Sequence, residues 1–348
     1  MRTNYEGEYI DEKERINCRC LVAITLLAGC GNNNNVKDES KKDTQSKSNY
    51  PVTIHNYTKA EGATTYKKKD QVFKKAPKRI VATTRPVAEL LLHLGLKNKI
   101  VGVGGSFGAP DKSVEKDYAS LKILSKSYIG KEVALGANPD IIIGRGGLFD
   151  NADWGVGTVD KLNDMGINTY ILNSSIPGGT YNSIYEDIDN LGKIFNVQDK
   201  AKEFSDTLKA RQKKITSKLS KIKETQTFAY LHMSDPKDVS VYSAYNETFF
   251  NNAFNMIKLK NIFENEKGNV SVETLVKANP DVLIVLNWEN DADKVKKALL
   301  ANPKLSSMKA IKNKQVYAVD YNYLFGYSYD TIDGIEQLAK EMHPNLFK

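Results

Sequence analysis

The sequence predicts an α/β protein of two Rossmann-like lobes with parallel-type sheets, bridged by a single long α-helix, with a ligand cleft between the lobes. Three observations support this prediction. Strand-like and helix-like segments alternate from about residue 51 onward. One sequence unit occurs twice, at 132–144 and at 273–285. A Lys-rich segment between the two copies carries its apolar residues at helical spacing.

Residues 1–29 are predicted to form a signal peptide. A short apolar stretch at 21–27 follows Arg15 and Arg19 and leads into Leu-Ala-Gly-Cys30. Small residues before a cleavage point suit a signal peptidase. The acidic residues that precede the stretch depart from the basic start of an ordinary leader. A small buried turn with an incidental Cys is the alternative interpretation of so short a pattern.

The Leu-Ala-Gly-Cys pattern resembles the lipobox of bacterial lipoproteins. The resemblance implies cleavage before Cys30, acyl chains such as palmitate on the new terminus, and a place on the outer face of the bacterial cell membrane. Two or more acyl chains give stable anchoring. Residues 30–49 are then the lipidated Cys and a flexible tether, because Val36 is the one apolar residue between Gly31 and Asn49.

Cysteine usage and charge exclude several classes of protein. All three cysteines lie in the first thirty residues, so the body has no disulfide framework, Cys-ligated metal or Cys nucleophile. The net charge of +8 comes from lysines spread along the chain. Nucleic-acid binding would need clustered basic residues with interleaved aromatics, so we expect no nucleic-acid partner.

The N-terminal lobe is predicted to span residues 50–180. KRIVATT (78–84) has the composition of a buried strand. A helix is expected over 86–96, because Pro86 suits its start and Gly95 its end. KIVGVGG (99–105) is a second short strand, which completes a βαβ unit.

A connecting region is predicted at 181–224 and a C-terminal lobe at 225–348. The apolar stripe between 198 and 223 predicts a helix roughly 39 Å long, which would hold the lobes at a nearly fixed separation. An ordinary surface helix is the alternative. In each copy of the repeated unit a Glu, at 132 or 273, stands seven residues before a Pro-Asp turn that leads into an apolar strand.

The body resembles the iron-siderophore, haem and cobalamin binding proteins of ABC importers. The segments that carry the resemblance are PKRIVA (77–82), AELLLHLG (88–95), IVGV (100–103), the two repeated units, KLNDMGINTY (161–170) and AIKNKQVYAVD (310–320). It covers about residues 76–348. It implies a monomer that delivers its ligand to an ABC permease and its ATPase, and it implies that Glu132 and Glu273 dock on the permease. Favouring a helix N-terminus through its dipole is the other role open to these carboxylates.

The ligand site is expected in the loops that follow the strands, where open α/β lobes bind ligands. Arg85 and Arg145 are the arginines in such loops, and Arg suits recognition of carboxylate, hydroxamate or catecholate oxygens. Each could instead form a salt bridge with a nearby acid. Aromatic side chains in these loops would wall a bulky ligand. The predicted ligand-binding residues are Arg85, Phe107, Tyr128, Arg145, Trp154, Tyr242, Trp288, Tyr323, Phe325 and Tyr327.

Together these features predict a binding protein that captures a ferric siderophore, with no catalytic residue, no cofactor and no directly bound metal. A haem carrier, with His232 as axial ligand, and a cobalamin carrier are the alternatives within the same fold. An extracytoplasmic enzyme or an adhesin is the alternative from another class. No Gly-x-Ser-x-Gly, His-Glu-x-x-His or phosphate-loop motif supports an enzyme.

Overall fold

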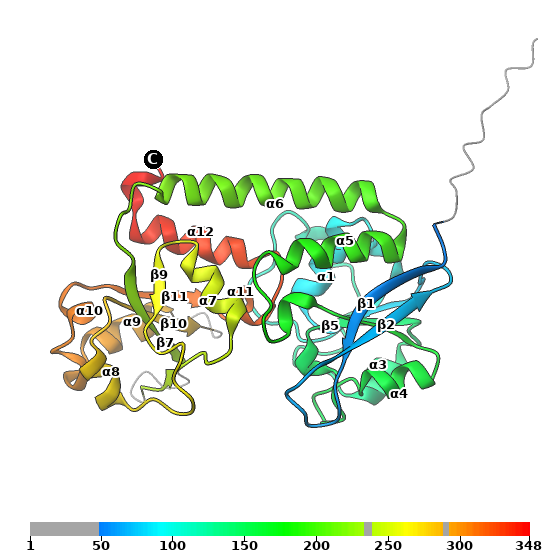
Figure 1. Cartoon of the computed structure of the whole chain (residues 1–348), viewed down its shortest axis with the longest axis horizontal. Coiled ribbons are helices and arrows are strands. Elements are labelled where there is room, and N and C mark those ends of the chain that lie inside the picture. The colour runs from blue at the N-terminus through cyan, green and yellow to red at the C-terminus, as the bar shows by residue number, and fades with distance from the viewer. Residues whose placement is uncertain (1–48, 233–238, 288–291) are drawn as a thin grey trace, which may run out of the picture. The chain divides into compact units, whose positions relative to one another are not determined.

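The computed structural model describes residues 49–232, 239–287 and 292–348. The predicted signal peptide, Cys30 and nearly all of the tether lie outside these ranges. Within them, one sheet forms in each half of the body, and a long helix, α6, runs past both halves (Figure 1). The α/β fold of two lobes with parallel-type sheets and one bridging helix is therefore confirmed.

The N-terminal lobe is built on a four-stranded parallel sheet in the order β4-β3-β5-β6. The two central strands, β3 and β5, are buried throughout. The strands are β3 (Ile80–Ala82), β4 (Ile100–Val103), β5 (Ile141–Gly144) and β6 (Asn168–Ile171). The helices around them are α1 (Arg85–His93), α2 (Glu115–Tyr118), α3 (Lys131–Gly136) and α4 (Val159–Asp164), with 3-10 turns at Lys97–Lys99, Gly146–Leu148 and Asn173–Ser175.

An antiparallel hairpin of β1 (Val52–Thr58) and β2 (Lys67–Phe73) precedes this sheet. Its edge is joined to β6 through the Asn56 side chain, which donates to the Ile171 carbonyl at 2.9 Å and accepts from the Ile171 amide at 2.9 Å. The amide group therefore takes the place of a neighbouring strand. The hairpin was not predicted, because β2 is Lys-rich and largely exposed and so lacks the pattern of a buried strand.

The first helix of the lobe occupies Arg85–His93, so it begins one residue before and ends three residues before the predicted 86–96. Pro86 stands in its first turn, as expected. Gly95 has a φ of +73°, a conformation that favours glycine and ends the helix.

The bridging segment contains α5 (Ser183–Phe195) and α6 (Gln198–Leu219). The predicted end of the long helix at 223 is too late, because the chain turns after Ser220 toward the next strand. With 22 residues, α6 is about 33 Å long. Its stripe packs inward, and Arg211 pairs with Asp333 and Glu336 of α12 (Thr331–Met342).

The C-terminal lobe has a five-stranded sheet in the order β11-β10-β7-β8, with β9 also paired to β7. All pairs are parallel except β7 with β8. The strands are β7 (Gln226–His232), β8 (Val241–Tyr242), β9 (Leu259–Asn261), β10 (Val282–Asn287) and β11 (Val316–Asp320). The other helices are α7 (Thr248–Asn255), α8 (Val272–Ala278), α9 (Ala292–Leu300), α10 (Lys309–Lys312) and α11 (Asn322–Phe325), with 3-10 turns at Pro303–Leu305 and Pro344–Leu346.

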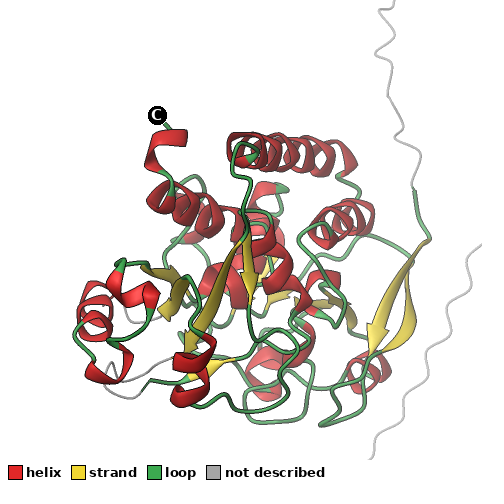
Figure 2. Ribbon diagram, turned by 60° about the vertical axis from the view of Figure 1, so that its left-hand side comes forward, coloured by secondary structure: helices red, strands yellow, loops and turns green. Residues whose placement is uncertain are grey.

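One large cluster of buried apolar side chains extends through both lobes, from Ile54 on β1 to Ala339 on α12. Hydrogen bonds cross between the lobes at its edge. Tyr329 donates its hydroxyl to Asp111 at 2.7 Å, and Ser174 donates to the Tyr327 carbonyl at 2.6 Å. Figure 2 shows the helices gathered around the strands of both sheets. Among the described helices, none combines the length and the apolar character that a membrane crossing requires.

Candidate functional site

A cavity of about 1030 Å³ lies between the lobes and takes residues from both. Clefts of this size accommodate large small-molecule ligands. The N-terminal lobe contributes the loop between β1 and β2 and the loops after β5 and β6, and the C-terminal lobe contributes the start of α7 and Tyr327. The lining residues are Tyr57, Lys59, Gly62, Ala63, Thr64, Thr65, Tyr66, Arg145, Gly147, Asp150, Ala152, Trp154, Ser175, Ile176, Pro177, Tyr245, Asn246, Glu247, Thr248, Phe249 and Tyr327.

Arg145 supplies a positive charge on the N-terminal wall of this cavity. It directly follows β5, so its position is fixed at the carboxyl end of a central strand. Its guanidinium donates to the Tyr128 hydroxyl at 2.8 Å and lies over the Tyr128 ring at 5.0 Å from the centroid. Phe107 packs edge-on against the same ring. These contacts orient the plane of the guanidinium, which is what bidentate recognition of oxygen atoms requires.

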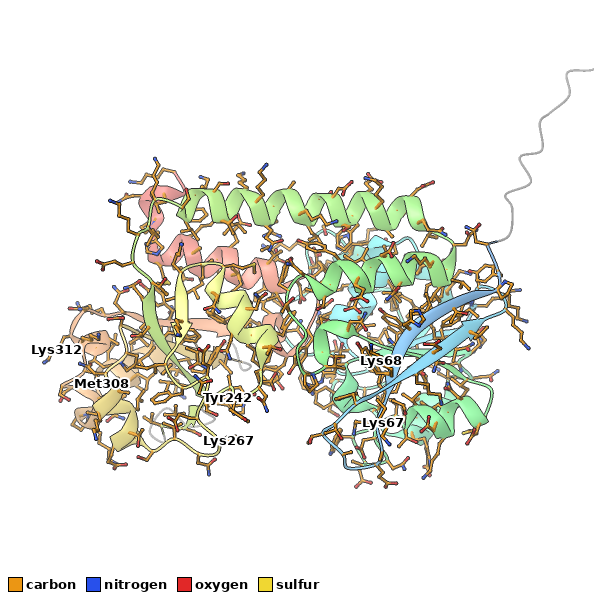
Figure 3. The ribbon with its side chains drawn as sticks, viewed as in Figure 1. Lys67, Lys68, Tyr242, Lys267, Met308 and Lys312 are labelled. Atoms are coloured by element: carbon orange, nitrogen blue, oxygen red, sulfur yellow. The ribbon has the colours of Figure 1, made fainter. Side chains whose placement is uncertain are left out.

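Glu247 supplies a negative charge on the C-terminal wall, immediately before α7. The Tyr242 hydroxyl donates to its Oε1 at 3.1 Å, and the Tyr327 hydroxyl donates to its Oε2 at 2.9 Å. Burial raises the pKa of Glu247, while the two tyrosine hydroxyls and the charge of Arg145 oppose the rise. Figure 3 shows Tyr242 on the C-terminal lobe and Lys67 and Lys68 on β2 of the N-terminal lobe.

The pKa of the Tyr66 hydroxyl is affected by charged residues on both walls of the cavity. Burial raises its pKa to about 12, Arg145 opposes that rise, and Glu247 and Asp150 add to it. Its hydroxyl lies where a side chain on Gly146 would be, since a Cβ at 146 would come within 2.5 Å of it. A glycine directly after Arg145 is therefore needed for Tyr66 to reach the cavity.

An ion pair between Lys59 and Asp150 holds the β1–β2 loop against the loop after β5. The two side chains are only 5% and 9% exposed. Asp150 also accepts the Gly62 amide at 3.0 Å and the Asn151 amide at 2.8 Å. The contact with Lys59 holds the pKa of Asp150 below its usual range. Since these charges neutralise each other, Arg145 and Glu247 carry the remaining charge of the lining in the part of the chain that the structure describes.

Several predicted ligand-binding residues meet at the cavity. Arg145, Trp154 and Tyr327 line it, and the indole of Trp154 is 49% exposed. Tyr128 and Tyr242 do not line the cavity themselves. Tyr128 accepts a hydrogen bond from Arg145, and Tyr242 donates one to Glu247, and both of these partners are lining residues. Phe325 belongs to an aromatic group on the C-terminal lobe, where it stacks on Tyr321 at 4.1 Å between centroids.

Six of the predicted ligand-binding residues lie outside the cavity lining, and two of these six make their contacts elsewhere. Arg85 begins α1, and its guanidinium donates to the Ser106 carbonyl at 3.2 Å and hydroxyl at 2.9 Å and covers the Tyr118 ring. Tyr323 lines a separate cavity of about 600 Å³ together with Arg211 and Asp333. It precedes Phe325 by two positions on α11, and positions two apart face different sides of a helix. The structure therefore does not bring Arg85 and Tyr323 to the lining of this cavity.

His232 ends β7 and lies near the rings of Tyr242 and Phe325, at 6.0 Å and 6.3 Å between centroids. Partial desolvation lowers its pKa. It is not among the residues lining the cavity. In the part of the chain that the structure describes, no three His, Cys, Asp or Glu residues are grouped to hold a metal ion. Trp288 lies outside the described residues.

Sequence reasoning missed Glu247, Tyr66 and the loop at 59–66. The signal for Glu247 was its place at a helix start after a Tyr-rich loop, where an acidic residue also has an ordinary dipole role. The loop begins with Lys59 and is rich in small residues, a composition typical of an exposed surface loop, so it gave no signal of a binding site.

Glu132 and Glu273 occupy equivalent places in the two lobes. Both are exposed in the first turn of a helix, α3 or α8, that leads through a Pro-Asp turn into a central strand. The helices lie on the side of the body away from α6 (Figure 1). The backbone amide of Glu273 and the Ser271 side chain hold the pKa of Glu273 below its usual value.

Comparison with known proteins gave the following matches. A family model described as periplasmic binding protein matches residues 80–323. The chain is 27% identical over 94% of its length, and 96% of the relative, to YvrC of Bacillus subtilis (strain 168), described as an uncharacterized ABC transporter substrate-binding lipoprotein.

Solved structures match with lower identity and show a shared fold. A periplasmic binding protein from Veillonella parvula matches with a TM-score of 0.73 at 23% identity, over 84% of this chain and 98% of that chain. An ABC-type Fe3+-hydroxamate transport system from Saccharomonospora viridis gives 0.67 at 22%, over 84% and 99%. A periplasmic heme-binding protein from Roseiflexus gives 0.61 at 18%, over 77% and 99%.

Proposed function

Because the chain belongs to the periplasmic binding protein family, we propose that it is the ligand-binding lipoprotein of an ABC importer and that it carries a ferric siderophore. It binds and releases this ligand outside the cell membrane and performs no chemistry on it. The relationship to a substrate-binding lipoprotein over nearly the whole of both chains supports this assignment.

The observation that carries the proposal is the cavity between the lobes. Its walls come from loops at the carboxyl ends of the strands in both sheets, where ligands of open α/β folds bind. A volume of about 1030 Å³ suits an iron chelate better than a bare ion or an amino acid.

The lining favours a chelate with exposed oxygen atoms. The guanidinium of Arg145 is held in one plane and can donate two parallel hydrogen bonds. Trp154, Tyr66 and Tyr245 offer flat surfaces to the organic part of a chelator. A haem or cobalamin carrier is the second candidate, but His232 lies outside the lining, which favours a siderophore over axial ligation of haem.

Delivery to the permease is assigned to Glu132 and Glu273. Two exposed carboxylates on rigid elements of separate lobes would register a partner that bears opposite charges. Acyl chains on Cys30 would keep the protein at the outer face of the membrane, close to the permease and its ATPase.

The test is a binding screen with the full chain in detergent solution. Tryptophan fluorescence is followed while ferric hydroxamate, catecholate and citrate-type siderophores, haem and cobalamin are added. We expect saturable quenching at sub-micromolar concentration by one siderophore class. Saturation by haem or cobalamin alone would replace the ligand assignment, and no saturation by any of these compounds would overturn the proposed function.

A further inference from the structure

The charges of the cavity point to a more specific ligand. We infer that the ligand presents a positively charged nitrogen in addition to its iron-binding oxygens, and that Glu247 receives this nitrogen while Arg145 contacts the oxygens. The inference rests on the proposed function and deepens it, since it selects among ferric siderophores by their charge.

The first step is the balance of charge on the cavity wall. Among residues 49–232, 239–287 and 292–348, the charged side chains that line it are Lys59, Arg145, Asp150 and Glu247. Lys59 and Asp150 form a nearly buried ion pair with each other. The described part of the wall therefore offers a ligand one cation and one anion, and a purely anionic ligand would leave Glu247 facing like charge.

The second step is that Arg145 and Glu247 do not neutralise each other by contact. Their charges influence one another, because Arg145 opposes the raised pKa of Glu247. Among the residues described, however, no ion pair joins the two side chains. They stand on different lobes, so a ligand between the lobes can touch one with each end.

The third step is the way Glu247 is held. One tyrosine hydroxyl donates to each of its oxygens, from Tyr242 and Tyr327. A carboxylate has about four acceptor sites, so roughly half remain for another donor. The tyrosines fix the carboxylate in one orientation, as a preformed subsite requires. Two neutral donors do not supply the positive charge that a partly buried carboxylate favours, and a ligand ammonium would.

This arrangement discriminates between siderophores. A ferric tris-catecholate carries three negative charges and would meet repulsion from Glu247, which costs more in a partly buried site than in water. A ferric trihydroxamate is neutral at its metal centre. A pendant ammonium then gives it a positive charge for Glu247, while its hydroxamate oxygens can accept from Arg145. We therefore expect the hydroxamate class, and within it the members that carry an amine.

The test compares two matched probes. Ferrioxamine B is a linear ferric trihydroxamate with a terminal ammonium, and ferrioxamine E is a cyclic trihydroxamate without one. Both are titrated into the full chain at neutral pH, with wild-type protein, Glu247→Gln and the control Glu61→Gln. Glu61 lies on the same β1–β2 loop but outside the cavity lining and is 61% exposed. Glutamine removes the charge and keeps one acceptor oxygen for a tyrosine hydroxyl, while its NH2 group can donate to the other hydroxyl. A melting curve for each variant checks that it folds.

We expect wild-type protein and Glu61→Gln to bind ferrioxamine B roughly tenfold to a hundredfold more tightly than ferrioxamine E. In Glu247→Gln this preference should vanish, because the affinity for ferrioxamine B should fall while that for ferrioxamine E changes much less. If ferrioxamine E binds as tightly as ferrioxamine B to wild-type protein, or if the preference survives in Glu247→Gln, the inference is wrong and the proposed function stands. If neither probe binds, both the inference and the hydroxamate assignment fall.

Discussion

The two lobes share one structural unit and differ at the cavity. In each, a short helix ends at an Asn in the left-handed conformation, at φ 51° for Asn138 and 49° for Asn279, and a Pro-Asp turn follows. Asp140 then accepts the amides of Lys78 and Arg79, at 2.7 and 2.8 Å, and Asp281 accepts the amide of Thr227 at 2.8 Å. In both lobes the carboxylate thus ties the entry of the neighbouring parallel strand.

The starts of the two helices show where the likeness ends. Helix α8 has a side-chain cap, since Ser271 accepts from the Thr274 amide at 3.1 Å. Helix α3 begins after Gly130 without one. A Cβ at 130 would come within 2.7 Å of the Asp153 carbonyl in the loop after β5. In the N-terminal lobe, the glycine at position 130 leaves α3 without a side-chain cap but allows the loop after β5 to approach the start of the helix.

The comparison therefore separates scaffold from specificity. The repeated unit places one exposed carboxylate on each lobe in the same local setting, which suits a partner that reads both lobes. The loops beyond the strands differ, with a hairpin and Arg145 on one lobe and aromatic rings with Glu247 on the other. The predictions below test that division.

The largest effect is expected from removing both shared carboxylates. Glu132→Ala combined with Glu273→Ala should reduce ligand uptake by whole cells at least tenfold. The reason is that both carboxylates proposed to contact opposite charges on the permease are lost. Ligand affinity of the purified protein should stay unchanged, since neither residue lines the cavity. Uptake is measured with iron-55-labelled ligand.

The control for this experiment is a double variant at other exposed glutamates, Glu115→Ala with Glu266→Ala, one on each lobe. It should transport normally. Transport at the wild-type rate by the Glu132 and Glu273 double variant would show that the shared unit serves the fold alone.

The next effect concerns the ion pair between Lys59 and Asp150. Among the described residues of the cavity wall, the C-terminal lobe has no equivalent pair. Lys59→Ala leaves the carboxylate of Asp150 buried without its partner and should lower the free energy of unfolding by about 3 kcal/mol. Replacing both residues, Lys59→Met with Asp150→Leu, should recover part of that loss. Urea denaturation measures both, and equal stability of Lys59→Ala and wild-type protein would contradict the role of the pair.

The pH dependence of this contribution follows from the lowered pKa of Asp150. The carboxylate stabilises the fold above the pKa that it has in the unfolded chain, and this stabilisation is lost as the pH falls through its lower folded value. The stability difference between wild-type protein and Lys59→Ala should therefore narrow in acid, below about pH 4.

A smaller effect separates the two predicted ligand-binding arginines. Arg145→Ala should weaken ligand binding roughly tenfold to a hundredfold, because a charge-assisted contact in the cavity is lost. Arg85→Ala should change the affinity less than about threefold, since Arg85 contacts Ser106 and Tyr118 instead. Isothermal titration with the ligand found in the screen decides between them, and the opposite ranking would place the site elsewhere.

The smallest effect tests the equivalence of the two Pro-Asp turns. Asp140→Ala and Asp281→Ala should each lower the free energy of unfolding by about 1–2 kcal/mol, because each leaves strand-entry amides without an acceptor. The loss should be somewhat larger for Asp281, which also pairs with Lys309. Asp153→Ala, at an exposed position, is the control. A cost at only one of the two sites would show that the repeat is unequal in its energetics.

The scaffold could be predicted from the sequence because its signals are local. A short stretch of sequence is enough to indicate each of these elements, through its apolar spacing or its turn residues. This holds for the two Pro-Asp units, the helix at 198–219 and the strands at 80–82 and 141–144. The hairpin escaped prediction because β2 is largely exposed and Lys-rich, with only Gln71 and Phe73 buried. The placement of Arg145 at the cavity followed from its position directly after a central strand.

The rest of the site depends on contacts between distant parts of the chain. Glu247 becomes a held, partly buried carboxylate through Tyr242, five residues before it, and Tyr327, eighty residues after it. Arg85 and Tyr323 lie outside the cavity lining, and the direction of such helical side chains depends on the residue at which the helix begins. Neither the contacts of Glu247 nor the directions of these two side chains can be predicted from residues that are close together in the sequence.

The shared apolar core has a thermodynamic consequence for both lobes. The same cluster contains Ile54, near the start of the folded body, and Ala339, in its last long helix. Complete unfolding of either lobe would expose part of this cluster on the other, so heat should melt the body in one cooperative transition. A ligand that touches only the cavity walls then raises the midpoint of that whole transition, and the last helix of the chain is stabilised by a molecule it never contacts.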